Sequence, residues 1–347
     1  MIKEAIRKIV EGKNLSFQEA RNVFLEIFEE KATSAQIASF LVSLRLKGET
    51  EEEIGGAAVV VRSKATKLKV REGLLGLDIE DEPVMDTCGT GGSGIEKFNI
   101  STAVAFVVSS LGVKVAKHGN RAASSHCGSA DVLEAMGLKI DVDPQVTEKA
   151  IKKIGMGFLF APLYHKAFKS VVPIRREIGI RTVFNILGPL CNPALANYQL
   201  LGVSDEKLVF KIARVLKRLN TKRAFVIYGE KVKDEVSLLG KTKVSFLNEN
   251  RIRNFYLVPS SFGLKRCSIK DLEAKTAQDS AKKIFDIFEG KKGGARDIVL
   301  ANASTCFYIL RKVRDLKEGV RLASQLIDEG KVKEKYLAFK RFLEEYG

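Results

Sequence analysis

The chain has 347 residues, of which 45% are hydrophobic and 29% are charged, as in an ordinary globular protein. No stretch approaches the ~20 consecutive apolar residues that cross a bilayer. The charged, amphipathic start MIKEAIRKIVEGKN is unlike a secretory signal peptide. We therefore expect a cytoplasmic protein with no membrane partner.

Charge and cysteine content narrow the classes of partner. The chain has 58 Lys and Arg against 42 Asp and Glu, a net charge of +16. Such an excess suits nucleic acid or small polyanionic substrates. Because no long basic run with interleaved aromatic residues exists, a solvated basic surface is favoured and nucleic-acid binding is the alternative. Five scattered cysteines without a CxxC pair, together with three histidines, disfavour a zinc site or a disulfide framework.

The first ~70 residues are predicted to be helical. Ser16 and Glu19 form a capping box before an apolar pattern of period 3.6 that runs to Phe28. Thr33 or Ser34 is expected to cap a second helix, and residues 51–67 form another. Their apolar faces suit packing on each other and on a partner subunit.

From about Val84 onward, short apolar strands alternate with helices, which predicts an α/β domain around a largely parallel sheet. Strands are expected at 84–86, 113–117, 157–160, 198–203 and 224–228, helices at 102–111, 130–136 and 207–219, a β excursion at 243–258, and helices from 278 to the end. Helices within 172–193 are expected to return to the N-terminal bundle. The predicted domains are therefore 1–72, joined by helices around 172–193, and an α/β domain of 73–171 and 194–347.

The first candidate site is the loop DTCGTGGSG, residues 86–94, which follows a strand. Glycines allow the backbone to approach an anion, and successive N–H groups form an anion nest. Ser101 and Thr102 can cap the helix that follows, whose N-terminus adds partial positive charge. No GK[ST] follows, which excludes a Walker loop, and the spacing disfavours a dinucleotide fingerprint.

Three more segments carry suitable chemistry. KHGNRAASSHCGSAD, residues 117–131, gathers cations and hydroxyls after a strand, as a phosphate-rich ligand requires. FAPLYHKAFKSVVPIRREIG, residues 160–179, offers an apolar wall with His165 and Arg175, and an arginine matches a small carboxylate bidentately. The adjacent carboxylates Asp234 and Glu235 suit Mg²⁺, which binds one or two carboxylates plus substrate phosphates. Together they suit displacement of a pyrophosphate-like leaving group by positioning and charge stabilisation.

These motifs, with FNIST, FNILGPLCNPA, DEVSLLG and RDIVLANAS, closely resemble the anthranilate phosphoribosyltransferase family over nearly the whole chain. The resemblance implies transfer of phosphoribosyl from phosphoribosyl pyrophosphate (PRPP) to anthranilate in tryptophan biosynthesis, with Mg²⁺ and a homodimer formed through the helical domain. Residues expected at PRPP, from the resemblance or the loops themselves, are Gly89, Gly92, Ser93, Lys97, Asn99, Ser101, Thr102, Lys117, Asn120, Arg121, Ser124, Ser125 and Ser129. Those expected at anthranilate are Gly89, His118, Asn120, Ala161, Pro162, His165, Arg175 and Gly188. Those expected at the metal are Ser101, Asp234 and Glu235.

The chain departs from the family pattern at three positions. Ser93 stands where the family usually has an acid, Lys97 where it usually has Thr, and Tyr228 where it commonly has His. The first two changes each make the loop more positive by about one charge. We therefore expect Lys97 to supply part of the pyrophosphate neutralisation that is usually left to metal.

Two rival functions remain open from the sequence. A pyrimidine-nucleoside phosphorylase-like enzyme would share the fold and a glycine-rich phosphate loop. A non-catalytic nucleic-acid-binding paralogue would account for the charge of +16. The FAPLYH and NILGPLCNP segments favour anthranilate over the first, and the intact KHGN and DE motifs argue against the second.

Overall fold

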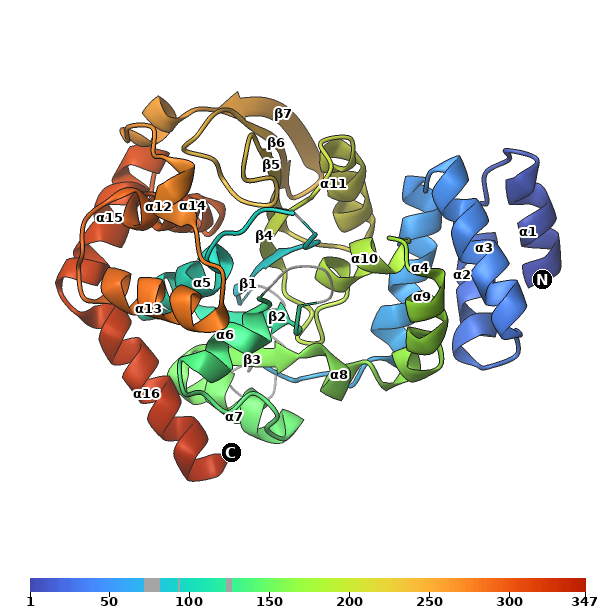
Figure 1. Cartoon of the computed structure of the whole chain (residues 1–347), viewed down its shortest axis with the longest axis horizontal. Helices are drawn as coiled ribbons and strands as arrows, with labels where there is room; N and C mark the ends of the chain where they lie inside the picture. The colour runs from blue at the N-terminus through green and yellow to red at the C-terminus, as the bar shows by residue number, and fades with distance from the viewer. Residues whose placement is uncertain (72–81, 93, 123–126) are drawn as a thin grey trace.

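A helical bundle lies at one end of the molecule and a larger α/β domain forms the rest (Figure 1). The computed structural model of the chain describes residues 1–71, 82–92, 94–122 and 127–347. The bundle begins with α1 (Ile2–Val10), α2 (Phe17–Phe28), α3 (Ser34–Lys47) and α4 (Glu51–Lys64). The predicted capping box before α2 is present, and Thr33 rather than Ser34 caps α3.

A later segment of the chain completes the bundle. It comprises η2 (Lys166–Ser170), α9 (Val172–Ile178), α10 (Phe184–Leu187) and η3 (Gly188–Leu190). The ring of Phe184 lies 5.8 Å from that of Phe24 and 6.1 Å from that of Phe28, between centroids. The chain therefore leaves the α/β domain, packs on the bundle and returns.

A seven-stranded sheet forms the centre of the α/β domain, in the order β3-β2-β1-β4-β5-β6-β7. The first five strands in this order pair in parallel, whereas β6 pairs antiparallel with both of its neighbours, β5 and β7. The strands are β1 (Val84–Gly89), β2 (Lys114–Gly119), β3 (Met156–Phe160), β4 (Tyr198–Gly202), β5 (Arg223–Gly229), β6 (Thr242–Asn248) and β7 (Arg251–Leu257). The predicted fold class is confirmed, and the carboxyl ends of the parallel strands meet at one edge, where α/β proteins bind ligands.

Helices cover both faces of the sheet (Figure 1). They are α5 (Ile100–Ser110), α6 (Ser129–Ala135), α7 (Pro144–Ile154), α8 (Ala161–Tyr164), α11 (Leu208–Arg218), α12 (Ile269–Leu272), α13 (Ala277–Phe288), α14 (Gly294–Ile309), α15 (Leu316–Asp328) and α16 (Lys331–Tyr346), with a short η4 (Pro259–Phe262). Among the described residues, no helix combines the length and the apolar character needed to cross a bilayer.

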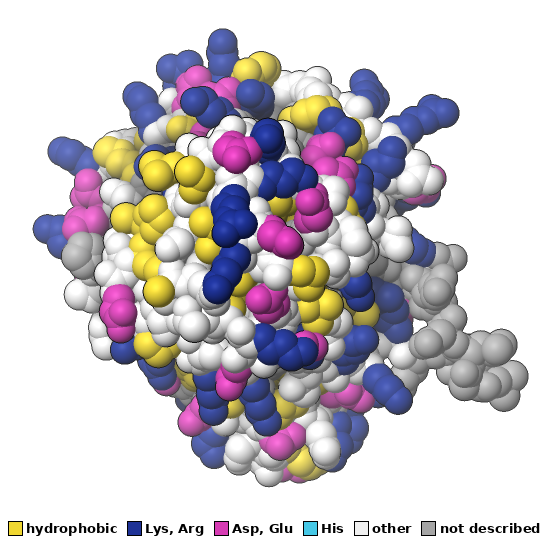
Figure 2. Space-filling model, turned by 90° about the vertical axis from the view of Figure 1, so that its right-hand side faces the viewer, with side chains coloured by type: hydrophobic (Ala, Val, Ile, Leu, Met, Phe, Trp, Pro, Cys, Tyr) yellow, Lys and Arg dark blue, Asp and Glu magenta, His cyan; other side chains and the backbone are white. Residues whose placement is uncertain are grey.

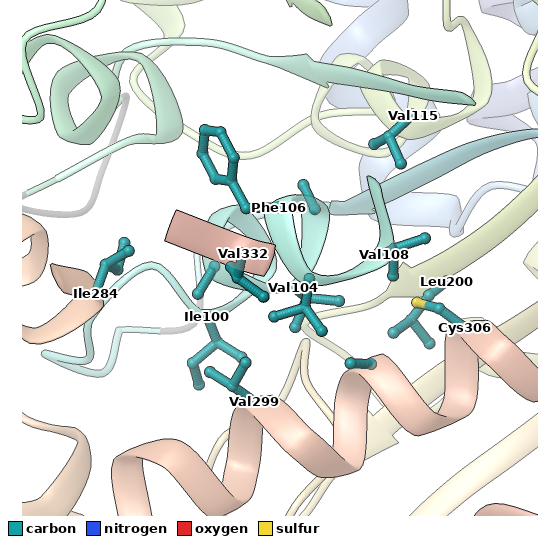
Figure 3. Close-up of a cluster of buried hydrophobic side chains, with 14 of the residues drawn as sticks. Ile100, Val104, Phe106, Val108, Val115, Leu200, Ile284, Val299, Cys306 and Val332 are labelled. Atoms are coloured by element: carbon teal, nitrogen blue, oxygen red, sulfur yellow. The ribbon is translucent and has the colours of Figure 1, made fainter. Parts of the chain in front are cut away.

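Helix α5 is the centre of the main core (Figure 3). Nearly all of its side chains are buried, because it packs on the sheet and against α14 and α16. Val104 and Phe106 lie among Val299 of α14, Val332 of α16 and Leu200 of β4. This burial fixes the helix rigidly, so that its N-terminus at Ile100 is held at the edge of the sheet where β1 ends.

Candidate active site

A glycine-rich loop follows β1 and encloses an arginine side chain. Gly91, Gly92 and Gly94 have φ values of 61°, 69° and 65°, a conformation that glycine adopts without a steric cost. A Cβ on Gly92 would lie 1.5 Å from Nη1 of Arg181. Arg181 Nη2 donates to the Thr90 and Gly91 carbonyls at 3.3 and 3.2 Å. Arg181 was not among the predicted site residues, because its sequence neighbourhood gives no sign that it reaches this loop.

The N-terminus of α5 points at the same place. Its cap is Asn99, whose Oδ1 accepts from the Thr102 N–H at 3.1 Å, so the expectation that Ser101 or Thr102 would cap the helix is wrong. Thr102 is fully buried behind the site, whereas Ser101 is only half-buried and lines the cavity. The partial positive charge of the helix start is thus available to an anion.

A buried lysine and a buried aspartate lie beneath the site. Lys117 is 1% exposed and donates to the Thr87 carbonyl at 2.7 Å and to Ser101 Oγ at 3.1 Å. Asp86 accepts from the Asn192 side chain at 2.8 Å and from the His118 N–H at 3.2 Å. Burial lowers the pKa of Lys117 and raises that of Asp86, and the attraction between the two opposite charges counteracts both shifts.

The predicted acidic pair lies directly on the strand ends, where three glycines make room for it. A Cβ on Gly202 of β4 would lie 1.9 Å from the Asp234 carbonyl oxygen. A Cβ on Gly229 of β5 would lie 2.2 Å from the Glu235 carbonyl oxygen, and one on Gly89 of β1 would lie 2.9 Å from Asp234 Oδ2. Side chains at these positions would push the acidic loop out of the site.

Glu235 is buried, and this burial raises its pKa to about 7. Lys97 and Lys117 counteract the shift, and the neighbouring Asp234 carboxylate adds to it. The Ser101 backbone N–H also donates to the Glu235 carboxylate. Glu235 is therefore hydrogen-bonded to the N-terminus of α5 and lies close to two lysines.

These residues fit a magnesium ion. Two carboxylates and the Ser101 hydroxyl are hard oxygen ligands of the kind that Mg²⁺ prefers. In the part of the chain that the structure describes, no group of three or more His, Cys, Asp or Glu side chains could hold a metal. The remaining ligands would thus come from water or a phosphorylated substrate, which is the usual arrangement for Mg²⁺.

The loop, the helix start and the acids enclose a cavity of about 280 Å³. Its lining includes nine of the residues expected at PRPP, namely Gly89, Gly92, Lys97, Asn99, Ser101, Lys117, Asn120, Arg121 and Ser129. The Arg121 guanidinium is engaged by Glu134 at 2.5 Å and by Asp131 at 3.2 Å. Ser93, Ser124 and Ser125 lie outside the described residues.

A second, largely apolar cavity of about 430 Å³ lies between the sheet edge and the returning helices. Seven of the residues expected at anthranilate line it, namely His118, Asn120, Ala161, Pro162, His165, Arg175 and Gly188. Gly89 lines the first cavity instead. The Arg175 guanidinium stacks over the Phe184 ring, 5.3 Å from its centroid, and burial lowers the pKa of this arginine. One partly buried cation in an apolar wall suits a small aromatic acid.

Two buried histidines form a neutral pair in this wall. Burial lowers the pKa of His118 to about 3 and that of His165 to about 4. His118 Nδ1 lies 3.1 Å from the Gly188 carbonyl oxygen, which can only accept, so Nδ1 carries the proton. His118 Nε2 must then accept from His165 Nε2 at 3.2 Å. His165 Nδ1 is left as a buried acceptor with no hydrogen-bond partner among the described residues.

The two cavities adjoin each other, since His118, Asn120 and Asn185 line both. Asn185 of α10 was not predicted, and the only sequence signal is one amide in the apolar run Val183–Leu187. A ligand in the polar cavity and a ligand in the apolar cavity would meet at these three side chains. The arrangement therefore suits a reaction between one polar ligand and one apolar ligand.

Comparison with known proteins agrees with this geometry. The model of the glycosyl transferase family a/b domain matches residues 81–333, and the model of its helical bundle domain matches residues 3–65. An anthranilate phosphoribosyltransferase of Geobacter sp. (strain M21) is 50% identical over 335 residues, covering 95% of each chain. The chain belongs to the anthranilate phosphoribosyltransferase family.

Solved structures of this family share the whole fold. The anthranilate phosphoribosyltransferase of Thermus thermophilus is 37% identical, with a TM-score of 0.89 over 98% of this chain and 99% of that one. The Saccharomyces cerevisiae anthranilate phosphoribosyltransferase in complex with PRPP and Mg is 26% identical, with a TM-score of 0.89 over 99% and 98%. The same yeast enzyme in complex with 4-fluoroanthranilate has a TM-score of 0.87 at 26% identity over the same shares. The rival functions left open by the sequence are not favoured.

Proposed function

We propose that this protein transfers the phosphoribosyl group of PRPP to the amine of anthranilate, releasing pyrophosphate, as a Mg²⁺-dependent step of tryptophan biosynthesis in the cytoplasm. The observation that carries the proposal is the pair of adjoining cavities, one polar and one apolar, which share His118, Asn120 and Asn185. The relatives named for this activity support it, as does the yeast enzyme with its bound PRPP, Mg and 4-fluoroanthranilate.

In this proposal the polar cavity holds PRPP. The glycine-rich loop and the N-terminus of α5 offer N–H groups to its pyrophosphate, and Lys117 adds a buried charge beneath them. Ser101, Asp234 and Glu235 would hold Mg²⁺, which when bound neutralises charge on the departing pyrophosphate. Ser93, Ser124 and Ser125 stay predictions, because the structure does not describe them.

The apolar cavity holds anthranilate. Arg175 would bind its carboxylate, and Ala161, Pro162 and the Phe184 ring would contact its ring. This wall excludes water from the amine, and neutral His118 and His165 do not repel the cationic ribose centre that develops as pyrophosphate leaves. Charge stabilisation and positioning thus carry the reaction, and no side-chain base is assigned.

The decisive experiment follows the fluorescence of anthranilate with purified protein. We expect loss of fluorescence only when PRPP and Mg²⁺ are both present, and formation of one pyrophosphate per anthranilate consumed. Asp234→Asn should slow the reaction by at least about 100-fold, because it removes a carboxylate from the metal site. Persistence of the anthranilate signal under all conditions, or phosphorolysis of thymidine or uridine instead, would refute the proposal.

We further propose that the protein is a homodimer formed through the helical domain. Large apolar side chains are exposed there, with Val10 of α1 70% exposed and Leu46 of α3 82% exposed. Figure 2 shows hydrophobic side chains gathered beside Lys and Arg on this end of the molecule. Light scattering should give twice the chain mass. Val10→Glu with Leu46→Glu should halve it, whereas Tyr256→Glu on β7 should not, and a wild-type monomer would contradict the assignment.

A further inference from the structure

Lys97, one of the departures from the family pattern, lies on the predicted metal-binding carboxylates. Its Nζ is 2.5 Å from Asp234 Oδ1 and also donates to the Val232 carbonyl at 2.8 Å. The side chains of Lys97 and Asp234 are only 9% and 13% exposed. This ion pair is therefore a partly desolvated contact inside the polar cavity and not a mobile surface pair.

This contact places the Lys97 ammonium beside a carboxylate that is expected to bind Mg²⁺. Asp234 Oδ1 is an oxygen that a Mg²⁺ ion at this acidic pair would use. An ammonium in hydrogen-bond contact with the same oxygen occupies one of its lone pairs and so competes with inner-sphere coordination there, and it repels a divalent ion a few ångströms away. The other buried lysine, Lys117, donates to the Thr87 carbonyl and to Ser101 Oγ, so it acts on the hydroxyl of the expected metal site and leaves Asp234 Oδ1 to Lys97.

Substrate binding gives the ammonium an alternative partner. Lys97 lines the same cavity as the glycine-rich loop and the N-terminus of α5, which are the anion-binding elements. A pyrophosphate group in this cavity would bring several negative charges within reach of the Lys97 ammonium. The lysine therefore has two sets of anions to neutralise, the protein's own acid and that of the substrate.

We propose that Lys97 is an internal counter-cation for Asp234, which competes with divalent metal for this carboxylate and turns to the pyrophosphate when metal binds. The inference rests on the proposed function for the identity of the site, and it adds how the metal is admitted. It means that this chain binds divalent metal at Asp234 and Glu235 more weakly than it would with a neutral residue at position 97.

The test is binding of Mn²⁺, an oxygen-seeking probe for Mg²⁺ sites, to the full-length protein without PRPP. Loss of the electron paramagnetic resonance signal of free Mn²⁺ gives the dissociation constant without any turnover. Lys97→Met removes the charge and keeps the stem, and Lys97→Gln keeps a hydrogen-bond donor without charge. We expect both to bind Mn²⁺ at least about tenfold more tightly than wild type.

Two controls fix the interpretation. Lys139→Met removes a surface lysine that contacts the Gly347 carbonyl, and it should bind Mn²⁺ as wild type does. Adding Asp234→Asn to Lys97→Met should abolish the gain. Equal dissociation constants in wild type and Lys97→Met, or a gain that survives Asp234→Asn, would overturn the inference. Failure of the proposed function would instead appear as absent anthranilate consumption with the Mn²⁺ result intact.

Discussion

Gly202 should be intolerant of a methyl group, although its β-strand backbone would accept alanine. A Cβ there would lie 1.9 Å from the Asp234 carbonyl oxygen, whereas ordinary contacts begin at 3.4 Å. Backbone cannot swing aside as a side chain can, so the Asp234–Glu235 loop must move by about 1.5 Å or β4 must bend. Misplacement of about 1 Å at a catalytic group costs ~100-fold in rate. Overpacking of this kind destabilises by about 1–3 kcal/mol.

Gly202→Ala should therefore fold but lose at least about 100-fold in kcat/KM for PRPP, together with Mg²⁺ affinity. A graded series checks the cause, because Gly229→Ala meets the Glu235 carbonyl at 2.2 Å and Gly89→Ala meets Asp234 Oδ2 at 2.9 Å. The loss in kcat/KM should be largest for Gly202→Ala, smaller for Gly229→Ala and smallest for Gly89→Ala. Gly55→Ala in α4, whose Cβ would meet the Phe17 ring at 3.3 Å and the flexible Arg218 side chain at 3.5 Å, should stay fully active. A folded Gly202→Ala enzyme with kcat/KM within threefold of wild type would refute this reasoning.

Three further predictions concern the two cavities. Arg175→Gln should raise KM for anthranilate by about tenfold or more and leave KM for PRPP unchanged. The control is Arg176→Gln, a change at the exposed neighbouring arginine. An equal rise of KM for anthranilate in both variants would contradict the assignment. Arg181→Met should raise KM for PRPP by about tenfold, because the loop loses its donor to Thr90 and Gly91, and an unchanged KM would count against it. The folded-state pKa of His165, about 4, lies below its ordinary 6.5, so the unfolded chain takes up the proton first as pH falls. Keeping His165 neutral therefore stabilises the fold fully above pH 6.5, and this stabilisation is lost toward pH 4 by up to about 1.4 kcal/mol per pH unit. When the free energy of urea unfolding is measured at pH 7 and pH 5, His165→Gln should lose less of it than wild type. Equal losses in the two proteins would exclude His165 as the source.

Much of the fold follows from local pattern. The capping box at Ser16 and the periodic apolar residues after it predict α2, and the alternation of short apolar runs with helices predicts the parallel sheet. Parallel strands end at one edge, so loops far apart in the chain could be placed together from order alone. Helix α7 was not predicted, because only Thr147, Ala150 and Ile151 are buried and its apolar stripe is short.

The contacts that define the site could not be read from local pattern. Lys97 and Asp234 are separated by 137 positions, and Arg181 meets Thr90 across 91. Such pairs depend on strand register and on the path of the segment after α9, which composition does not specify. The role of Gly202 is hidden for the same reason, since a glycine at a strand end indicates close approach but not what approaches. Asn99 caps α5 in place of the predicted Ser101, because the helix begins at Ile100, one residue before Ser101.

The two matched domains do not have separate interiors. The core of the helical bundle includes Val209 and Ile212 of α11 and Leu201 of β4, beside Phe24 and Leu41 of the bundle. Removing the first four helices would therefore uncover an apolar face of the α/β domain and remove Val61 from the lining of the apolar cavity. The boundary between the two matched domains is thus not a boundary between two hydrophobic cores. A designer who exchanged the bundle for that of a relative would have to exchange α11 with it.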